Sequence, residues 1–424
     1  MKGEVLTIGD ELLRGEIIDS NKSFLSERLL RLDIETHFHG SVRDDPADMT
    51  DAFRRAVSRA DVVLVSGGLG PTRDDLTIEV LARTFGRKLV RHEPSLAAIR
   101  AFFASVGREM APVNAKQADL PEGAEALANP LGTAPGCLLE VDGRQIFCLP
   151  GVPRELHRMM DEEVLPRIAA RHPGRAVVRA RLLRTFGMGE SNLEEALADV
   201  AKEGEVVLGF RTAFPDNLLR PLTRAASAEE ADARLDAVCT AIRSRLGALV
   251  YAEGDEPMEA VVGELLREQR RTLAVAESCT GGSIAERVTS VAGASKYFLG
   301  GVVAYSNEAK RKLLDVPAEL LDRHGAVSEE VALAMADGVR ARFGSDLAVA
   351  TTGISGPGGG AADKPVGTVC VALAAAGERH AERFVFPLDR ARHRSLTTQL
   401  ALDWVRRTLL RQPLVAPTIL RRRS

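Results

Sequence analysis

Cysteine is scarce in this chain, and its spacing fits neither a disulfide framework nor a zinc site. Only five of the 424 residues are cysteines, and no two of them form a C-x-x-C pair: Cys137, Cys148, Cys239, Cys279 and Cys370. An odd number of dispersed thiols argues against a disulfide-stapled secreted protein and against structural zinc. We therefore expect reduced thiols in a cytoplasmic protein.

Long apolar runs, a dominant charge and a signal sequence are also lacking. No stretch approaches the roughly 20 apolar residues of a membrane span, and the first apolar run, at residues 4–8, is too short for a signal peptide. The formal net charge is only −3 and aromatic residues make up 4% of the chain, so no basic, aromatic-studded surface is expected. We predict neither a membrane nor a nucleic-acid partner, and interpret the arginines at 421–423 as a solvated tail.

The sequence does show two long regions in which short apolar segments alternate with amphipathic helical ones. This rhythm predicts mostly parallel sheets with helices on both faces, and ligand sites beyond the carboxyl ends of the strands. The intervening segment has strand-like alternation, two helical stretches and an expected loop at residues 209–217, which is typical of a small α+β module. We predict an α/β protein with two three-layer domains at 1–170 and 253–412, an α+β module at 171–252 and a tail at 413–424.

The most informative motif is Ala-Glu-Ser-Cys-Thr-Gly-Gly at residues 276–282. It follows a short apolar run and predicts a strand that leads through a tight turn into a helix. Such a turn can hold a nucleophile beside exposed N–H groups, here those of residues 280–282. Ser278 is either a helix N-cap or a nucleophile with Lys310 as its base, provided that burial or nearby cations lower the lysine pKa. Cys279 is the rival nucleophile, but no histidine follows at a suggestive position, so serine is favoured.

A glycine-rich segment at residues 351–360 follows a predicted strand at 346–350. Such a loop lets backbone amides approach a phosphate, although its spacing is not that of an ATP-binding P-loop. Lys364 and the arginines of 390–394 could complete a phosphate site. Tyr305 is suited either to relay a proton or to stack on an aromatic substrate.

A second constellation lies at the predicted strand ends of the N-terminal region. Residues 66–77 combine three glycines with Asp74 and Asp75 and open a helix. Glycines admit a phosphate, and paired carboxylates could hold a divalent cation that bridges a diphosphate. The alternative interpretation is that the two aspartates merely complement the helix dipole. Glu11 and the loops at 129–136 and 149–155 would join the same edge.

Four motifs occur in order at residues 277–282, 305–310, 325–328 and 364–368, and together they resemble the C-terminal domain of the CinA family. The resemblance implies hydrolysis of the amide of nicotinamide mononucleotide (NMN) to nicotinate mononucleotide and ammonia. It implies catalysis by Ser278, Lys310 and Tyr305 without metal or other cofactor. The groups expected to bind NMN are Thr280, Gly281, Gly282, Asn307, Thr352, Gly353, Gly356, Lys364, Arg390 and Arg394.

The two arginines are alternatives for one family position. Arg390, which follows Asp389, best matches an Asp-Arg pair of the family, and Arg394 is a close alternative. The family commonly has glycine before that pair, whereas this chain has Pro387-Leu388.

The N-terminal motifs resemble the molybdopterin-binding-like domain that begins full-length CinA proteins, a domain associated in the family with metal-dependent hydrolysis of ADP-ribose to AMP and ribose 5-phosphate. The resemblance implies Glu11, Asp74 and Asp75 as ligands of Mg²⁺ or Co²⁺. The groups expected to bind ADP-ribose are Gly9, Asn21, Gly67, Gly68, Gly70, Pro71, Thr72, Gly132, Thr133 and Gly151. The resemblance also suggests a homodimer.

A different class of function stays open at this point. The chain could be a pterin- or nucleotide-binding regulatory protein linked to competence or DNA damage, without turnover in its N-terminal domain. Salt-sensitive retention on DNA would separate this hypothesis from the two hydrolytic activities.

Overall fold

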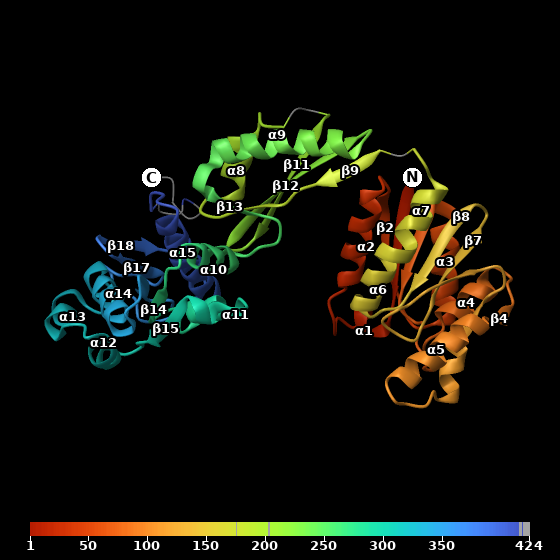
Figure 1. Cartoon of the computed structure of the whole chain (residues 1–424), viewed down its shortest axis with the longest axis horizontal. Helices are drawn as coiled ribbons and strands as arrows, with labels where there is room; N and C mark the ends of the chain where they lie inside the picture. The colour runs from red at the N-terminus through yellow and green to blue at the C-terminus, as the bar shows by residue number, and fades with distance from the viewer. Residues whose placement is uncertain (175, 202–203, 415–417, 419–424) are drawn as a thin grey trace. The chain divides into compact units, whose positions relative to one another are not determined.

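The computed structural model describes residues 1–174, 176–201, 204–414 and 418 (Figure 1). The chain divides into two compact units, one formed by Met1–Arg179 with Arg224–Asp232 and the other by Ala180–Thr223 with Ala233–Ser424. Most of the tail predicted at 413–424 lies outside the described residues. Within the described ranges, no helix has both the length and the apolar composition needed to cross a membrane.

The first unit contains a six-stranded sheet in the order β2-β1-β3-β8-β7-β6. Its strands are β1 (Lys2–Ile8), β2 (Glu35–Val42), β3 (Val62–Ser66), β6 (Glu125–Leu127), β7 (Gly136–Val141) and β8 (Arg144–Leu149). The first three pairs in this order are parallel, and β7 and β6 add an antiparallel edge. A separate two-stranded sheet pairs β4 (Leu89–Arg91) with β5 (Asp119–Pro121).

Helices cover both faces of this sheet because successive side chains of its buried strands point to opposite sides. Val5 and Leu64 lie in the core that α2, α6 and α7 cover, whereas Leu6 and Val63 lie in the core shared with α3 and α4. The α-helices of this part are α1 (Asp10–Leu13), α2 (Ser20–Arg31), α3 (Pro46–Arg59), α4 (Thr77–Thr84), α5 (Glu93–Ser105), α6 (Pro153–Met159) and α7 (Leu165–Arg171). A 3-10 segment, η1 (Pro112–Ala118), and a π segment, η2 (Met160–Val164), complete it.

The module has the element order of a ferredoxin-like fold from β10 onward, strand–helix–strand–strand–helix–strand. Its elements are β9 (Val177–Ala180), β10 (Leu183–Thr185), α8 (Glu190–Leu197), β11 (Val206–Ala213), β12 (Asp216–Ala225), α9 (Ala228–Leu246), η3 (Gly247–Leu249) and β13 (Val250–Glu253). The sheet order is β11-β12-β10-β13, with β9 also paired to β12.

The loop predicted at residues 209–217 is wrong. β11 and β12 form a hairpin through this segment, and only Phe214 and Pro215 connect them. The polar residues that looked like a loop are paired across the hairpin: Thr212 lies opposite Asn217, and its hydroxyl contacts the Asn217 Oδ1 at 2.8 Å. β11 is largely exposed or half-buried, whereas β12 is mostly buried and includes the polar residues Asp216 and Asn217, so the hairpin lacks a clear alternation of polar and apolar residues.

The C-terminal domain is built on a five-stranded sheet in the order β15-β14-β16-β17-β18. Its strands are β14 (Leu273–Glu277), β15 (Phe298–Val303), β16 (Leu347–Gly353), β17 (Thr368–Ala375) and β18 (Glu378–Val385). β14, β15 and β16 are parallel, and β17 and β18 add an antiparallel hairpin. Its helices are α10 (Met258–Glu268), α11 (Ser283–Ser290), η4 (Ala294–Lys296), α12 (Asn307–Leu314), α13 (Ala318–His324), α14 (Glu329–Phe343) and α15 (Arg390–Leu409).

Side-chain size sets the two faces of this sheet apart. Leu273 and Val275 pack in the core that contains α10, α11 and α15, whereas Ala274 and Ala276 pack beneath α14. Small residues let a helix approach a sheet closely. The three parallel strands end side by side, so the segments that follow them meet at one edge.

The predicted fold class, two mostly parallel α/β domains joined by a small α+β module, is confirmed. The boundaries assigned to the domains stay predictions.

Candidate functional site

Ser278 and Lys310 meet at the carboxyl edge of the C-terminal sheet. Ser278 directly follows β14, and Lys310 projects from the inner face of α12. The Lys310 Nζ lies 3.1 Å from the Ser278 Oγ and donates to the Ala304 carbonyl at 2.8 Å. Ser278 is 7% exposed and Lys310 only 1%. Burial lowers the pKa of Lys310, as a lysine base requires.

Cys279 lies on the other side of the turn, in the hydrophobic core. It is 4% exposed and packs in the cluster that contains Leu273 and Val275. Burial raises the pKa of its thiol to about 12. The nucleophile of a thiol is its thiolate, so this environment disfavours Cys279.

The turn after Ser278 is held by Glu277, a fully buried carboxylate that sequence reasoning did not assign to the site. It accepts from the N–H groups of Gly282, Ile284 and Ala285 at 2.9 to 3.1 Å. The helix α11 begins only at Ser283, with Gly282 as its N-cap. The N-cap interpretation of Ser278 is therefore wrong.

Some backbone N–H groups of the serine turn already donate to protein oxygens, and others do not. The Gly281 N–H donates to the Ser278 carbonyl at 3.1 Å, and the Gly282 N–H donates to Glu277. In the described part of the chain, the N–H groups of Cys279 and Thr280 donate to no oxygen of another residue. These two N–H groups are the free donors next to the nucleophile.

Arg390 and Arg394 of α15 have different hydrogen-bond partners. Arg390 donates to the Tyr305 hydroxyl at 3.0 Å and to the Gly356 carbonyl at 2.9 Å, so it links the segment before α12 to the glycine-rich loop. Arg394 donates to the Thr280 carbonyl at 2.7 Å and to the Ser283 hydroxyl at 3.0 Å. Arg394 thus braces the serine turn from behind. Its guanidinium is already engaged by the protein.

Tyr305 is 62% exposed and has no hydrogen bond to Ser278 or Lys310 among the described residues. Its ring is open to solvent, and its hydroxyl is held by Arg390. This placement favours the stacking role over the proton relay.

The glycine-rich loop begins where β16 ends. Thr352 and Gly353 belong to the strand, and the Thr352 hydroxyl donates to the Ala326 carbonyl at 2.7 Å. Lys364 donates to the His324 carbonyl at 2.6 Å. Both predicted contacts of NMN therefore lie beside the segment 325–328, whose motif contributed to the family resemblance.

A buried histidine from α15 fastens the two ends of this loop. His393 is within hydrogen-bonding distance of the Ser355 hydroxyl, 2.9 Å from Nδ1, and of the Gly367 carbonyl, 3.1 Å from Nε2. A carbonyl can only accept, so Nε2 carries the proton and Nδ1 accepts from serine. Burial lowers the pKa of His393, which favours this neutral form.

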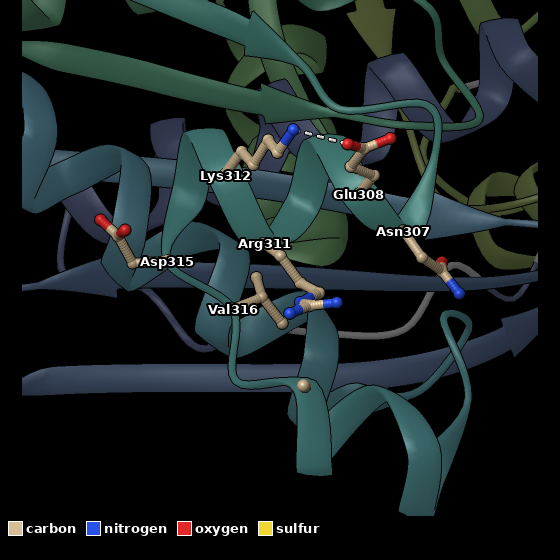
Figure 2. Close-up of a pocket in the computed structure, with 7 residues that line it drawn as sticks. Asn307, Glu308, Arg311, Lys312, Asp315 and Val316 are labelled. Carbon is tan, nitrogen blue, oxygen red and sulfur yellow. Dashed lines mark ion pairs between the residues drawn. The ribbon is translucent and has the colours of Figure 1, made fainter.

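Among the described residues, Asn307 makes no hydrogen bond to Ser278 or Lys310. Figure 2 shows it at the start of α12, beside a surface hollow of about 640 Å³ that Arg311 and Val316 also line. Glu308 and Lys312 form an ion pair of 2.6 Å on the same helix. The assignment of Asn307 to NMN stays a prediction.

The N-terminal candidates surround a cavity of about 440 Å³ at the carboxyl edge of the first sheet. The predicted residues that line it are Gly9, Glu11, Gly67, Gly68, Gly70, Pro71, Asp74, Asp75, Thr133 and Gly151. The remaining predicted residues, Asn21, Thr72 and Gly132, contact residues that line the cavity. Asn21 donates to the Gly151 carbonyl at 2.8 Å, and the Thr72 N–H donates to Asp75 at 2.9 Å. Gly132 lies so close to Glu155 that a Cβ there would overlap the Glu155 side chain.

Two further carboxylates, Asp44 and Glu155, line the same cavity. Glu155 belongs to the loop at 149–155 that was expected at this edge, whereas Asp44 was not among the predicted residues. Burial raises the pKa of Asp44, with smaller contributions from Glu11, Asp10 and Asp74. Five carboxylates in one cavity, with no lysine or arginine among its lining residues, make it strongly anionic.

The carboxylates do not form a ready metal site. Over the ranges that the structure describes, no three His, Cys, Asp or Glu side chains are placed to hold a metal ion. Asp75 is instead engaged by the N–H and hydroxyl of Thr72.

Three family models match the chain in succession. The "Probable molybdopterin binding domain" matches residues 4–170, the "Damage-inducible protein CinA KH domain" residues 180–252, and the "CinA C-terminal domain" residues 255–409. A CinA-like protein of Geotalea uraniireducens is 43% identical over 413 residues, which cover 97% of this chain and 98% of the relative. The chain belongs to the CinA family.

A second relative is similar over nearly the same length. A CinA-like protein of Citrifermentans bemidjiense is 45% identical over 411 residues, which cover 97% of this chain and 98% of the relative. The crystal structure of CinA from Thermoplasma acidophilum is 34% identical and covers 39% of this chain and 97% of its own, with a TM-score of 0.37. The segment matched by the CinA C-terminal domain contains Glu277, Ser278, Lys310, Arg390 and Arg394.

Proposed function

We propose that the C-terminal domain is an amidase that hydrolyses NMN to nicotinate mononucleotide and ammonia. The observation that carries this proposal is the buried Ser278–Lys310 pair, with 3.1 Å between Oγ and Nζ. A lysine with a lowered pKa next to a serine is a known way to activate a hydroxyl for acyl transfer. The family resemblance supplies the identity of the amide.

In the first half of the reaction, neutral Lys310 accepts the proton of the Ser278 hydroxyl as Oγ attacks the amide carbon. Lys310 can do this while still donating to Ala304, because a neutral amine has two N–H groups and one lone pair. The oxyanion would accept from the free N–H groups of Cys279 and Thr280. Lys310 then gives its proton to the amide nitrogen, the C–N bond breaks, and ammonia leaves.

In the second half, water attacks the ester that joins the nicotinoyl carbon to Ser278. Lys310 accepts a proton from this water and returns it to the Ser278 Oγ as the C–O bond breaks. The product is the nicotinate carboxylate, and the enzyme regains its starting form. No metal is needed at this centre.

The exposed groups around the pair suit a nucleotide. Tyr305 offers an open ring for stacking on the pyridinium, which is aromatic and cationic. Arg390 and Lys364 bring positive charge to the glycine-rich loop, where the phosphate would lie.

The experiment is ammonia release from NMN by the full chain, with product identification by chromatography. Wild-type protein should form equal amounts of ammonia and nicotinate mononucleotide without added metal, and Ser278→Ala should form neither. Absence of both products with wild-type protein would refute the assignment.

We propose a second activity for the N-terminal domain. It would hydrolyse ADP-ribose to AMP and ribose 5-phosphate, with Mg²⁺ or Co²⁺. The supporting observation is the anionic cavity lined by glycines and by Glu11, Asp74 and Asp75. Five carboxylates would repel a diphosphate unless a cation came with it. Mg²⁺ commonly binds through one or two carboxylates plus substrate phosphates, so a ready three-ligand cluster is not required.

Asp75→Ala should abolish metal-dependent AMP release from ADP-ribose while ammonia release from NMN continues. AMP release that survives in Asp75→Ala, or that needs no metal, would contradict the proposal. The regulatory alternative predicts pterin or nucleotide binding without turnover and salt-sensitive retention on DNA. Against the latter, residues 180–252 contain no G-x-x-G sequence, the loop with which KH domains clamp nucleic acid.

Cytoplasmic localisation and a homodimer complete the proposal. All five cysteines are free and buried, which suits a reducing compartment. Light scattering of the purified chain would test the dimer.

A further inference from the structure

A chain of hydrogen bonds starts at a buried carboxylate of the module. Asp216, the first residue of β12, is 8% exposed. One of its oxygens accepts from the Tyr251 hydroxyl at 2.5 Å and from Arg184 at 3.3 Å, both within the module. Its other oxygen accepts from Nε2 of Gln399 on α15 at 2.6 Å. The hairpin of the module is thus tied to a helix of the C-terminal domain.

The chain continues from α15 to α11. The Gln399 Oε1 accepts from Arg287 at 2.7 Å, and Arg287 pairs with Glu259 of α10 at 2.5 Å. Gln399 donates at one end of its amide and accepts at the other, so only one orientation of the amide satisfies both partners. Loss of the Gln399 amide removes both hydrogen bonds, whereas loss of Asp216 leaves the amide held only by Arg287.

Both helices lead to the serine turn. Arg287 lies one turn after Ser283, where α11 begins and where Glu277 binds the first N–H groups. Arg394, which holds the Thr280 carbonyl, precedes Gln399 on α15 by five residues, or about 7.5 Å along a helix. A helix transmits a displacement over such a length with little bending, so the module is mechanically connected to the turn.

The module has other attachments that do not depend on Asp216. Arg406 of α15 donates to the Ala248 carbonyl at 2.6 Å, and Phe186 packs in the core of the C-terminal domain. We therefore expect the module to stay docked when Asp216 is replaced. Replacing Asp216 would instead disturb the alignment of α11 and α15 with the serine turn.

Building on the amidase function proposed above, we propose that Asp216 of the module is a positioning residue for Ser278 and acts through Gln399. The module would then be part of the working amidase. Its role is to hold α11 and α15 so that the nucleophile and the neighbouring N–H groups stay aligned.

Steady-state hydrolysis of NMN by the full chain tests this proposal. Asp216→Ala and Gln399→Met should each lower kcat by about 10- to 100-fold, the size of effect that a small misplacement of reacting groups produces. KM should change little, because the nucleotide is held by other residues. The double variant should be no slower than the worse single variant, since both break one chain. Asp216→Asn keeps an oxygen for Gln399 and should recover part of kcat.

The matched control is Thr223→Val on the same strand. The Thr223 hydroxyl donates to the Glu205 carbonyl at 2.7 Å inside the module, so this variant removes a module hydrogen bond without touching the chain to α15. It should keep kcat. An equal loss of kcat in Thr223→Val, or wild-type kcat in Asp216→Ala, would overturn the proposal.

Hydrogen exchange separates this inference from the amidase assignment. The amides of residues 282–290 should exchange faster in Asp216→Ala and Gln399→Met than in wild type or Thr223→Val. If wild-type protein released no ammonia but showed this pattern, the proposed substrate would fail and the link to the turn would stand. Unchanged exchange in these amides would refute the link itself.

Discussion

The choice between Ser278 and Cys279 can be tested by the reactivity of the thiol. An ordinary cysteine has a pKa of about 8.5, whereas burial raises the pKa of Cys279 to about 12. At pH 7.5 the ordinary thiol is about 10% thiolate and one with a pKa near 12 is about 3 parts in 10⁵ thiolate. Alkylation of Cys279 by iodoacetamide should therefore be on the order of 10³-fold slower in the folded protein than in urea.

Peptide mapping by mass spectrometry after timed alkylation measures this rate, and ammonia release from NMN is followed on the same samples. Ser278→Ala should lose activity by a factor on the order of 10⁵ or more, as removal of a dedicated serine nucleophile does elsewhere. Cys279→Ala should keep most of the activity and lose some stability, because it deletes a buried sulfur from the core.

Two results would refute the reasoning. One is rapid alkylation of Cys279 that abolishes ammonia release in step with modification. The other is an active Ser278→Ala protein paired with an inactive Cys279→Ala protein. Either would mean that the thiol is exposed and ionised in the working enzyme.

The remaining predictions concern Lys310 and Glu277. The lowered pKa of Lys310 predicts that kcat/KM rises about tenfold per pH unit below that pKa, because only the neutral amine accepts a proton. Lys310→Arg should be inactive at every pH. A pH profile of kcat/KM that is unchanged in this variant would contradict the assignment. The unfolded state binds more protons at Lys310 than the folded state between the lowered and the ordinary pKa, so the free energy of unfolding should fall as pH drops through that interval, and urea denaturation should show a weaker dependence in Lys310→Met. Glu277→Gln replaces one acceptor oxygen of the carboxylate by a donor, so it should lower the free energy of unfolding by about 1–3 kcal/mol and also lower activity. Thermal denaturation and ammonia release measure the two effects. A variant with wild-type stability would show that the N–H groups of α11 do not need this carboxylate.

The proximity of Ser278 and Lys310 was predictable because it follows from local strand, turn and helix geometry. An apolar strand, a turn and a helix place Ser278 at a sheet edge, and Lys310 follows another strand that ends at the same edge. The lowered pKa of Lys310 was not predictable in this way. Its burial depends on the packing of α12 and on the Ala304 carbonyl, which come from the assembled domain.

The residues that sequence reasoning missed are charged groups with internal partners. Glu277 ends a strand and was given no role from the sequence, but it is fully buried against the N–H groups of α11. Asp216 fell in a segment expected to be a loop, whereas it starts a strand and meets Gln399, 183 positions away. Such pairings depend on long-range contacts, and no local periodicity carries a signal for them.

Glu277 also explains why a thiol and a hydroxyl can stand side by side with only the hydroxyl suited to attack. The pKa of a cysteine near a helix N-terminus is usually lowered, because free N–H groups stabilise its thiolate. Here the first N–H groups of α11 are bound by Glu277, and the negative charge of that carboxylate adds to the effect of burial in raising the pKa of Cys279. In the proposed mechanism the serine needs no such field, because Lys310 would take its proton directly. Burial is the main cause of the raised pKa of Cys279, and the carboxylate that fixes the turn adds to it; both effects favour Ser278 over Cys279 as the nucleophile of the proposed amidase.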